Sequence, residues 1–224
     1  MSEKRIYYRR NRADKALLEK YQHVVTPHIS DNMDRLRGGT AELRPLHGDG
    51  KLVGTALTVK TRPGDNLIIH KALDMLEPGD VLVVDAGGEL KNAVFGEIMM
   101  TIAMEKQAAG IVINGSIRDV AAFKEANYPI YAKGVTHLGP YKDGPGEINV
   151  PVEIDSMIVN PGDLVVGDED GLVVVPLAET EGLLPKIDAY QAKEEKQIEE
   201  IKAGTVDRSW IDKTLKEKGY QFIE

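Results

Sequence analysis

The strongest constraint on the fold is an alternation of short apolar runs with segments of helical spacing in the middle of the chain. Residues 81–85 and 111–114 consist mainly of Val, Leu and Ile, a composition typical of strands buried on both faces of a sheet. Apolar residues recur at helical spacing over residues 67–76, 96–110 and 120–127. Strands that alternate with helices in this way form a parallel sheet covered by helices. The sequence therefore predicts an α/β fold.

The N-terminal part of the chain is expected to be helical before the first strand. Residues 13–24 have helical spacing, Thr26 and Pro27 interrupt it, and residues 30–33 resemble the cap of a second short helix. Residues 52–60 are β-branched and partly alternate between apolar and polar, which predicts a strand.

The second half of the chain is first rich in β-structure and then helical. Residues 134–151 are rich in Gly and Pro and are expected to be irregular, whereas residues 152–159, 164–167 and 172–175 are apolar enough to be strands. Residues 179–203 carry a thin apolar stripe among many charges, which predicts one long amphipathic helix followed by a short tail.

A chain of 224 residues fits one domain. We expect this single domain to span residues 1–224, with a helical N-terminus over 1–45, an α/β/β core over 46–176 and a helical C-terminal tail over 177–224.

The composition excludes several classes of function. The chain has 36 acidic and 28 basic residues, and this net charge of -8 argues against a nucleic-acid partner, because phosphate binding needs a basic face. Cysteine is absent, which excludes thiolate chemistry, disulfides and cysteine zinc sites. The basic N-terminus is not followed by an apolar run of signal length, and no stretch approaches the roughly 18 apolar residues of a membrane helix. We expect a cytoplasmic protein with no membrane partner.

Arg118 and Asp119 are the first candidates for chemistry. They follow a buried strand, and in open α/β sheets ligands bind where a strand ends and the next helix begins. An Arg-Asp pair in a turn is more often a solvated ion pair, and Asp119 is also placed to cap the helix that starts at Val120. In the functional interpretation, Arg118 clamps an anion and Asp119 holds a hard cation.

A second carboxylate, Glu97, is predicted at the start of the helix that follows Gly96. The helix dipole alone favours a carboxylate there, so Glu97 has a structural interpretation as well. In the functional one, the free N–H groups of Ile98 and Met99 hold a substrate carboxylate, Gly96 lets the ligand approach the backbone, and Glu97 reaches the cation. The implied chemistry is metal-assisted work on a small carboxylate.

Asp85, His70 and His137 are weaker candidates. Asp85 precedes Gly87 and Gly88, and it either lines the same cleft or satisfies nearby backbone N–H groups. The glycine pair lacks the spacing of a nucleotide-binding motif. Lone histidines such as His70 and His137 are more often structural than catalytic. Because zinc motifs are absent, hard oxygen ligands remain, and these suit Mg²⁺ first and also Mn²⁺.

Taken together, these motifs resemble those of the family that contains the 4-hydroxy-4-methyl-2-oxoglutarate aldolases and the regulator of ribonuclease activity A. In the aldolase branch an acidic residue follows a glycine at a helix start, and here Arg118 lies 21 positions after Glu97. The family usually has Asp where this chain has Glu97. The resemblance covers nearly the whole chain and rests in addition on residues 65–72, 83–88, 110–115 and 167–171.

The resemblance implies roles for five residues. Asp119 would bind the divalent metal directly, and Arg118 would contact the 2-oxo acid and stabilise the oxyanion. Glu97 would order metal-bound water. The N–H groups of Ile98 and Met99 would hold the carboxylate of pyruvate.

The resemblance also implies a fold and an assembly. The fold would be a three-layer α/β/β/α sandwich of the swivelling, phosphohistidine-like type with a long C-terminal helix. The assembly would be a homotrimer or a hexamer built as a dimer of trimers, in which a glutamate from the C-terminal helix of the next subunit completes the site. Glu194 is our match for this glutamate, and Glu195, Glu199 and Glu200 are the alternatives.

The implied activity is that of a class II, metal-dependent pyruvate aldolase acting on a small 2-oxo acid. A metal-stabilised pyruvate enolate would serve both the cleavage of 4-hydroxy-4-methyl-2-oxoglutarate and the decarboxylation of oxaloacetate. The competing interpretation is a non-enzymatic regulator that binds a ribonuclease or another protein. A third is a related lyase or hydratase for a different 2-oxo acid. The intact pair Arg118 and Asp119 favours the enzyme.

Overall fold

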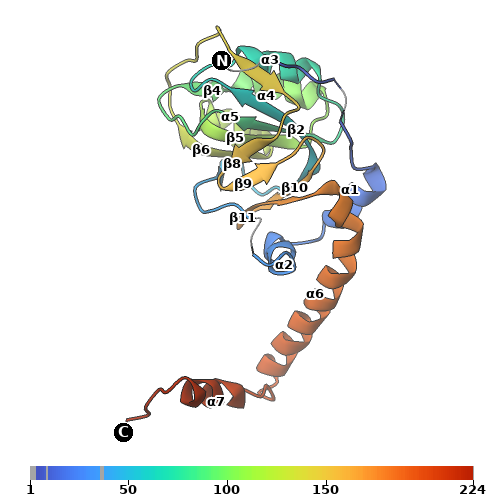
Figure 1. Ribbon diagram of the computed structural model, residues 1–224, viewed down its shortest axis with the longest axis vertical. Helices are drawn as coiled ribbons and strands as arrows, with labels where there is room; N and C mark the ends of the chain where they lie inside the picture. Colours follow the sequence, from blue (N-terminus) through green and yellow to red (C-terminus); the bar gives the residue numbers. More distant parts are fainter. Residues whose placement is uncertain (1–3, 9, 36–37, 224) are drawn as a thin grey trace.

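The computed structural model describes residues 4–8, 10–35 and 38–223. Figure 1 shows an α/β body and a long C-terminal helix that projects from it. Part of the basic N-terminal stretch, residues 1–3 and 9, lies outside the described residues. None of the helices in the described ranges has both the length and the apolar character that a membrane crossing needs.

A mixed sheet forms the centre of the body. Its main path runs in the order β1 (Arg44–Pro45), β6 (Ile130–Val135), β5 (Gly110–Ile117), β3 (Asp80–Asp85), β2 (Leu52–Thr61), β10 (Leu164–Asp168) and β11 (Gly171–Val175). Two short strands lie off this path: β4 (Ala93–Phe95) pairs with β5, and β7 (Gly146–Ile148) pairs with β2. The pairs β2–β3, β3–β5 and β5–β6 are parallel, which confirms the predicted parallel part. The strands β1, β7, β10 and β11 join it antiparallel.

Opposite faces of the sheet are covered by different layers. The helices α3 (Leu67–Asp74), α4 (Glu97–Glu105) and α5 (Val120–Ala126) pack on one face, where Ile69, Met100 and Phe123 belong to a buried apolar cluster with residues of β2, β3 and β5. The other face carries the hairpin of β8 (Val152–Ile154) and β9 (Met157–Val159), whose apolar residues join a second cluster.

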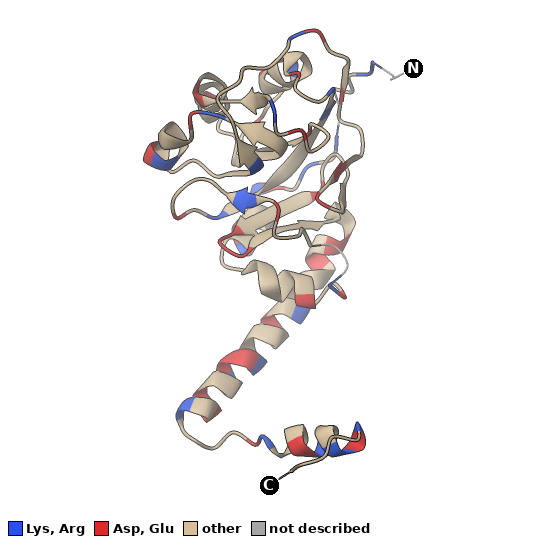
Figure 2. Cartoon of the chain, turned by 90° about the vertical axis from the view of Figure 1, so that its left-hand side faces the viewer, with Lys and Arg blue, Asp and Glu red and all other residues tan. Residues whose placement is uncertain are grey.

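A third cluster joins the terminal helices to β10 and β11. It contains residues of α1 (Lys15–Tyr21), α2 (Thr26–Asp31) and the first turns of α6 (Thr180–Lys202), which follows the short 3-10 helix η1 (Leu177–Glu179). The last buried residue of α6 is Ile187. Tyr190 and Glu194 still contact α2, and the rest of the helix projects from the body. Charged residues lie along its length (Figure 2). The final helix, α7 (Ser209–Glu217), has no buried residue and lies at the far end of α6 (Figure 1).

The mixed α/β architecture and the long C-terminal helix confirm the predicted fold class. Two predictions about turns are wrong. Helix α2 begins at Thr26 with Pro27 in its first turn and ends at Asp31, because proline is compatible with the first helical positions, whose N–H groups have no helical acceptor. The predicted strand 152–159 is a hairpin, because Asp155 and Ser156 adopt left-handed φ values of 48° and 68° and reverse the chain.

Several elements were missed. Strand β1 lies in the part expected to be helical, strand β6 was not assigned, and η1 precedes α6. Strand β4 precedes α4, strand β7 lies within the segment expected to be irregular, and α7 lies in the expected tail. Strands β4 and β7 have three residues each. Such short segments show no periodicity of their own, so their conformation depends on pairing with β5 and β2.

Candidate active site

A cavity of about 100 Å³ opens where β4 and β5 end and α4 and α5 begin. Its lining includes six residues that the sequence singled out, namely Gly96, Ile98, Met99, Arg118, Asp119 and the weaker candidate His70. Asn66 and Lys142 also line it. The structure therefore brings together the helix start and the Arg-Asp pair, as predicted from their positions at strand ends.

Asp119 is held by the helix opposite, not by its own. It is the N-cap residue of α5 in a left-handed conformation with φ 61°, and its side chain makes no capping hydrogen bond there. Its Oδ2 atom instead accepts a hydrogen bond of 3.1 Å from the backbone N–H of Glu97 and lies 3.5 Å from Nε of Arg118. The alternative in which Asp119 simply caps α5 is therefore wrong.

Gly96 makes this close arrangement possible. A Cβ atom on Gly96 would lie 2.6 Å from Oδ2 of Asp119 and 3.1 Å from Cγ of Arg118. Real Cβ atoms do not approach other atoms so closely, so any side chain here would displace the pair. The role predicted for Gly96, close approach to the backbone, is thus filled first by the protein's own Asp119.

The start of α4 offers donors to the cavity. The first N–H groups of a helix have no acceptor within the helix, and the N-cap residue of α4, Gly96, has no side chain that could accept from them. Glu97 gives its N–H to Asp119, which leaves those of Ile98 and Met99 for a ligand. The Glu97 side chain is exposed and is not among the residues that line the cavity.

Two polar residues of the lining, Asn66 and Lys142, were missed by the sequence analysis. The ammonium of Lys142 donates to Oδ1 of Asn66 over 3.3 Å. Lys142 comes from the Gly- and Pro-rich segment 134–151, where nothing in the local pattern distinguishes it from a solvated surface lysine. The signal available in the sequence was Asn66 itself, a polar residue directly before an apolar helix. In the structure Asn66 is the N-cap residue of α3, but its side chain makes no capping hydrogen bond.

His70, one of the weaker candidates from the sequence, also lines the cavity. Burial lowers the pKa of His70 below its ordinary value, the charge of Lys142 lowers this pKa further, and Asp74 opposes the shift. The ring is therefore neutral at neutral pH and leaves Arg118 and Lys142 as the cations that line the cavity. The second weak candidate, His137, is exposed and does not line this cavity.

Glu194 lies away from the cavity within the chain. It sits on α6, where its Oε2 atom is 2.6 Å from Nε2 of His28 on α2. Nearby, the hydroxyl of Tyr190 donates to Asp31 over 2.8 Å, so these contacts tie α6 to α2. Helix α6 points away from α4 and α5 (Figure 1). The role of Glu194 across a subunit interface stays a prediction.

Asp85 does not share the cleft. Its Oδ1 atom accepts hydrogen bonds from the Gly87 N–H at 2.9 Å and from Asn114 Nδ2 at 3.1 Å. It lines a separate cavity of about 420 Å³. The interpretation that Asp85 satisfies nearby backbone groups is the one the structure supports.

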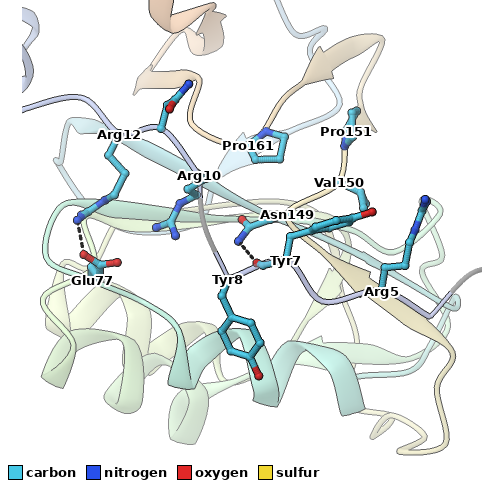
Figure 3. Close-up of a pocket in the computed structure, with 11 residues that line it drawn as sticks. Arg5, Tyr7, Tyr8, Arg10, Arg12, Glu77, Asn149, Val150, Pro151 and Pro161 are labelled. Carbon is cyan, nitrogen blue, oxygen red and sulfur yellow. Dashed lines mark hydrogen bonds and ion pairs between the residues drawn. The ribbon is translucent and has the colours of Figure 1, made fainter.

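A larger cavity of about 880 Å³ lies beside the N-terminal segment (Figure 3). Its three arginines are already paired with carboxylates. Arg12 contacts Glu77 at 2.5 Å and Asp80 at 3.1 Å, Arg10 also contacts Asp80, and Arg5 contacts Glu147 at 2.8 Å. Because these charges are matched, the cavity offers little for an anionic ligand. Arg118 is also paired, with Asp119 at 3.5 Å, but its cavity is lined in addition by Lys142 and by the start of α4.

The donor set fits a hard divalent cation better than zinc. No group of three or more His, Cys, Asp or Glu side chains suited to a metal occurs among the described residues. Asp119, whose side chain is 40% exposed and which lines the cavity, has one oxygen engaged by Glu97 and the other without a hydrogen bond to the described residues. Mg²⁺ is commonly held by one or two carboxylates and several waters, so Asp119 suits it.

Known proteins are similar along most of the chain. The profile of the RraA-like family, described as Aldolase/RraA, matches residues 26–174. A Halalkalibacterium halodurans protein that bears the provisional name of a 4-hydroxy-4-methyl-2-oxoglutarate aldolase is 35% identical over 206 residues, which cover 92% of this chain and 98% of that protein. A Thermus thermophilus protein named 4-hydroxy-4-methyl-2-oxoglutarate aldolase is 34% identical over 58% of this chain and 78% of its own length.

Solved structures show the same fold. An uncharacterised protein from Pseudomonas syringae pv. tomato superposes with a TM-score of 0.79 at 29% identity, covering 88% of this chain and 92% of that one. Streptomyces coelicolor RraAS2, titled an unusual member of the RNase ES inhibitor RraA protein family, superposes with a TM-score of 0.77 at 29% identity, covering 84% of this chain and 98% of that one.

Proposed function

We propose that this chain, which belongs to the RraA-like family of Aldolase/RraA proteins, is a divalent-metal-dependent pyruvate aldolase. It would cleave 4-hydroxy-4-methyl-2-oxoglutarate, or a related 4-hydroxy-2-oxo acid, to pyruvate and a second oxo compound. It would also decarboxylate oxaloacetate. Relatives that bear the aldolase name support the lyase class, and the metal, the substrate and the decarboxylase activity are our own extension.

One observation carries the proposal. A carboxylate, a guanidinium and a helix start face one small cavity, and Asp119 accepts only the first N–H of α4, that of Glu97, at 3.1 Å. A 2-oxo acid presents a carboxylate beside a ketone, so it needs N–H donors for the first and a positive potential for the second. The cavity offers both.

The residues of the chain have distinct tasks in cleavage. The N–H groups of Ile98 and Met99 hold the carboxylate of the substrate, and the guanidinium of Arg118 donates to the keto oxygen. As the bond between C3 and C4 breaks, its electron pair moves toward C2 and the keto oxygen gains negative charge, which Arg118 stabilises. The C4 hydroxyl gives its proton to a water molecule and becomes the carbonyl of the second product, and C3 later takes up a proton from water to give pyruvate.

Asp119 would hold the cation, which supplies Lewis-acid polarisation of the substrate ketone when bound. The same residues serve decarboxylation, because loss of carbon dioxide from oxaloacetate also leaves an electron pair at C3. In 4-hydroxy-4-methyl-2-oxoglutarate the second carboxylate stays on the second product, and we assign it to Lys142, the other cation of the cavity.

The assembly is part of the proposal. We propose a homotrimer or a dimer of trimers, in which a glutamate of α6 reaches the cavity of the next subunit. The outer half of α6 supports this, because Ile198 and Ile201 are 44% and 54% exposed on a helix that leaves the body. Exposed apolar residues on a projecting helix are typical of subunit contacts.

The experiment is an assay of pyruvate release from 4-hydroxy-4-methyl-2-oxoglutarate and from oxaloacetate, with the rate without enzyme subtracted. We expect activity with Mg²⁺, loss of it after treatment with a chelator, and recovery on addition of Mg²⁺ or Mn²⁺. A rate that the chelator does not change would contradict the proposed mechanism. Because the structure is similar to that of RraAS2, a non-enzymatic regulator is the second candidate function. Capture of a ribonuclease by this protein, together with no release of pyruvate, would favour that function.

Gly96→Ala is expected to lower kcat/KM about 10²-fold, because a shift of the reacting groups by an ångström has an effect of that order. The new Cβ would lie 2.6 Å from Oδ2 of Asp119 and push this carboxylate from its place. The matched control is Gly182→Ala on α6, where nothing lies within 4 Å of the added Cβ. Full activity of Gly96→Ala would show that the close contact with Asp119 is not needed.

A further inference from the structure

Asp65 is a fully buried carboxylate to which the proposed function gives no task. Its Oδ2 atom accepts hydrogen bonds from the backbone N–H groups of Asp143 at 2.7 Å and Gly144 at 3.0 Å, and from Arg62 at 3.0 Å. Its Oδ1 atom accepts from the N–H of Leu67 at 2.9 Å, at the start of α3. One carboxylate thus joins the start of α3 to a loop 78 residues further along the chain.

The same loop carries Lys142, and its backbone is fixed on both sides of that residue. Before it, the N–H of Asn66 donates to the Tyr141 carbonyl over 3.0 Å, and the N–H of Tyr141 donates to the Gly64 carbonyl over 2.8 Å. After it, the N–H groups of Asp143 and Gly144 are those that Asp65 accepts. The backbone of Lys142 is therefore held although no helix or strand includes it.

Asn66 connects this arrangement to the cavity wall. Its Oδ1 atom accepts from Lys142 at 3.3 Å, and its Nδ2 atom donates to the Val94 carbonyl at 3.2 Å. The ammonium of Lys142 is therefore held by Asn66 in the lining of the cavity to which the start of α4 also belongs. Hydrogen bonds to a buried carboxylate are strong and directional. Removal of the Asp65 charge would therefore loosen the loop that carries Lys142 more than it would disturb α4.

We propose that Asp65 is a positioning residue that sets the preference of the site for substrates with two carboxylates. Its carboxylate holds the backbone of residues 141–144 so that the ammonium of Lys142 meets the second carboxylate of the substrate. This inference rests on the proposed function and adds to it the residue that controls substrate class.

The test compares two substrates that differ only at the second carboxylate. One is 4-hydroxy-4-methyl-2-oxoglutarate, and the other is 4-hydroxy-4-methyl-2-oxopentanoate, in which a methyl group replaces that carboxylate. The quantity measured is the preference, defined as the ratio of the two kcat/KM values with Mg²⁺ present. We expect Lys142→Met to lower the preference roughly 10-fold or more, because the second carboxylate is left without its cation. We expect Asp65→Asn to lower it several-fold in the same direction.

A double-mutant cycle separates positioning from a general structural role. If Asp65 acts through Lys142, Asp65→Asn has no further effect on the preference when Lys142→Met is already present. Arg62→Gln is the second variant in case Asp65→Asn does not fold, since the Arg62 side chain is 40% exposed and contacts both Asp65 and Asp143. It is expected to lower the preference by a smaller factor.

Asp155→Asn is the matched control. Asp155 is also a buried carboxylate, 7% exposed, and accepts from the backbone N–H and the hydroxyl of Thr40 at 2.5 and 2.6 Å, but it lines a different cavity. Its left-handed φ of 48° is tolerated by Asn. We expect a lower melting temperature and an unchanged preference.

The outcomes distinguish this inference from the proposed function. Pyruvate release from neither substrate by the wild-type protein with Mg²⁺ would overturn the proposed function and the inference with it. Cleavage of both substrates with a wild-type preference near one, or an equal loss on both substrates in Asp65→Asn, would overturn the inference alone. A fall in preference that persists unchanged in the Lys142→Met background would also overturn it.

Discussion

Asp119→Ala is expected to lower the metal-dependent rate of pyruvate release by roughly 10³-fold or more. A Lewis acid contributes several kcal/mol to the stabilisation of the transition state, and each 1.4 kcal/mol corresponds to a factor of about ten in rate. Asp119 supplies the carboxylate that suits the cation, so this contribution is lost with it. Calorimetric titration should show the same loss in Mg²⁺ affinity.

Asp119→Asn tests the loss of the carboxylate charge separately from the backbone strain that alanine would introduce at this position. Asp119 has φ 61°, and alanine in the left-handed region costs about 1–2 kcal/mol in stability, whereas asparagine visits this region more readily. Asparagine also keeps an oxygen that can accept the Glu97 N–H. We therefore expect Asp119→Asn to be as inactive as Asp119→Ala but closer to the wild type in thermal unfolding. Glu125→Ala, on the exposed face of α5, is the control for loss of a carboxylate. Metal-dependent activity in Asp119→Asn would exclude Asp119 as the metal ligand.

Arg118→Ala is the variant with the second largest expected effect, a fall in kcat of about 10²- to 10³-fold. This is the usual effect of removing one donor that faces developing negative charge. The donor acts mainly when charge appears on the keto oxygen, so we expect kcat to fall more than KM rises. Arg118→Lys should recover only part of the rate, because an ammonium lacks the planar donor fork of the guanidinium.

The control for Arg118→Ala is Arg44→Ala, on an exposed position of the edge strand β1. It should keep the wild-type kcat. If Arg118→Ala raised KM and left kcat unchanged, Arg118 would serve substrate binding only, and the role in charge stabilisation would be wrong.

Both expectations depend on a pair that could be identified from the sequence. Arg118 and Asp119 follow an apolar strand, and the position of ligand sites at strand ends is a general property of α/β sheets. Gly96 and the helix start at Glu97 were recognised in the same way, because a glycine before an apolar helical segment is a local signal. The residues that meet in this cavity at the strand ends could thus be inferred from short-range patterns.

The second cation of the cavity could not be inferred in this way. Lys142 lies in a loop whose place is set by Asp65, and the hydrogen bond from Gly144 to Asp65 spans 79 residues. Nothing in a Gly- and Pro-rich segment indicates which distant carboxylate will hold it. The same holds for Asp85, which looked equivalent to Asp119 as an acidic residue after a buried strand but lines a different cavity.

The sequence alone determined strands β2, β3 and β5, helices α3, α4 and α5, the long C-terminal helix and the residues at the strand ends, because these follow from periodicity and from short-range backbone preferences. Only the tertiary structure decided which residues meet. It placed Asp119 against the start of α4, Lys142 against Asn66, and Glu194 against His28. These contacts join segments far apart in the chain, and they form only when the strands have paired in register and the helices have packed on the sheet.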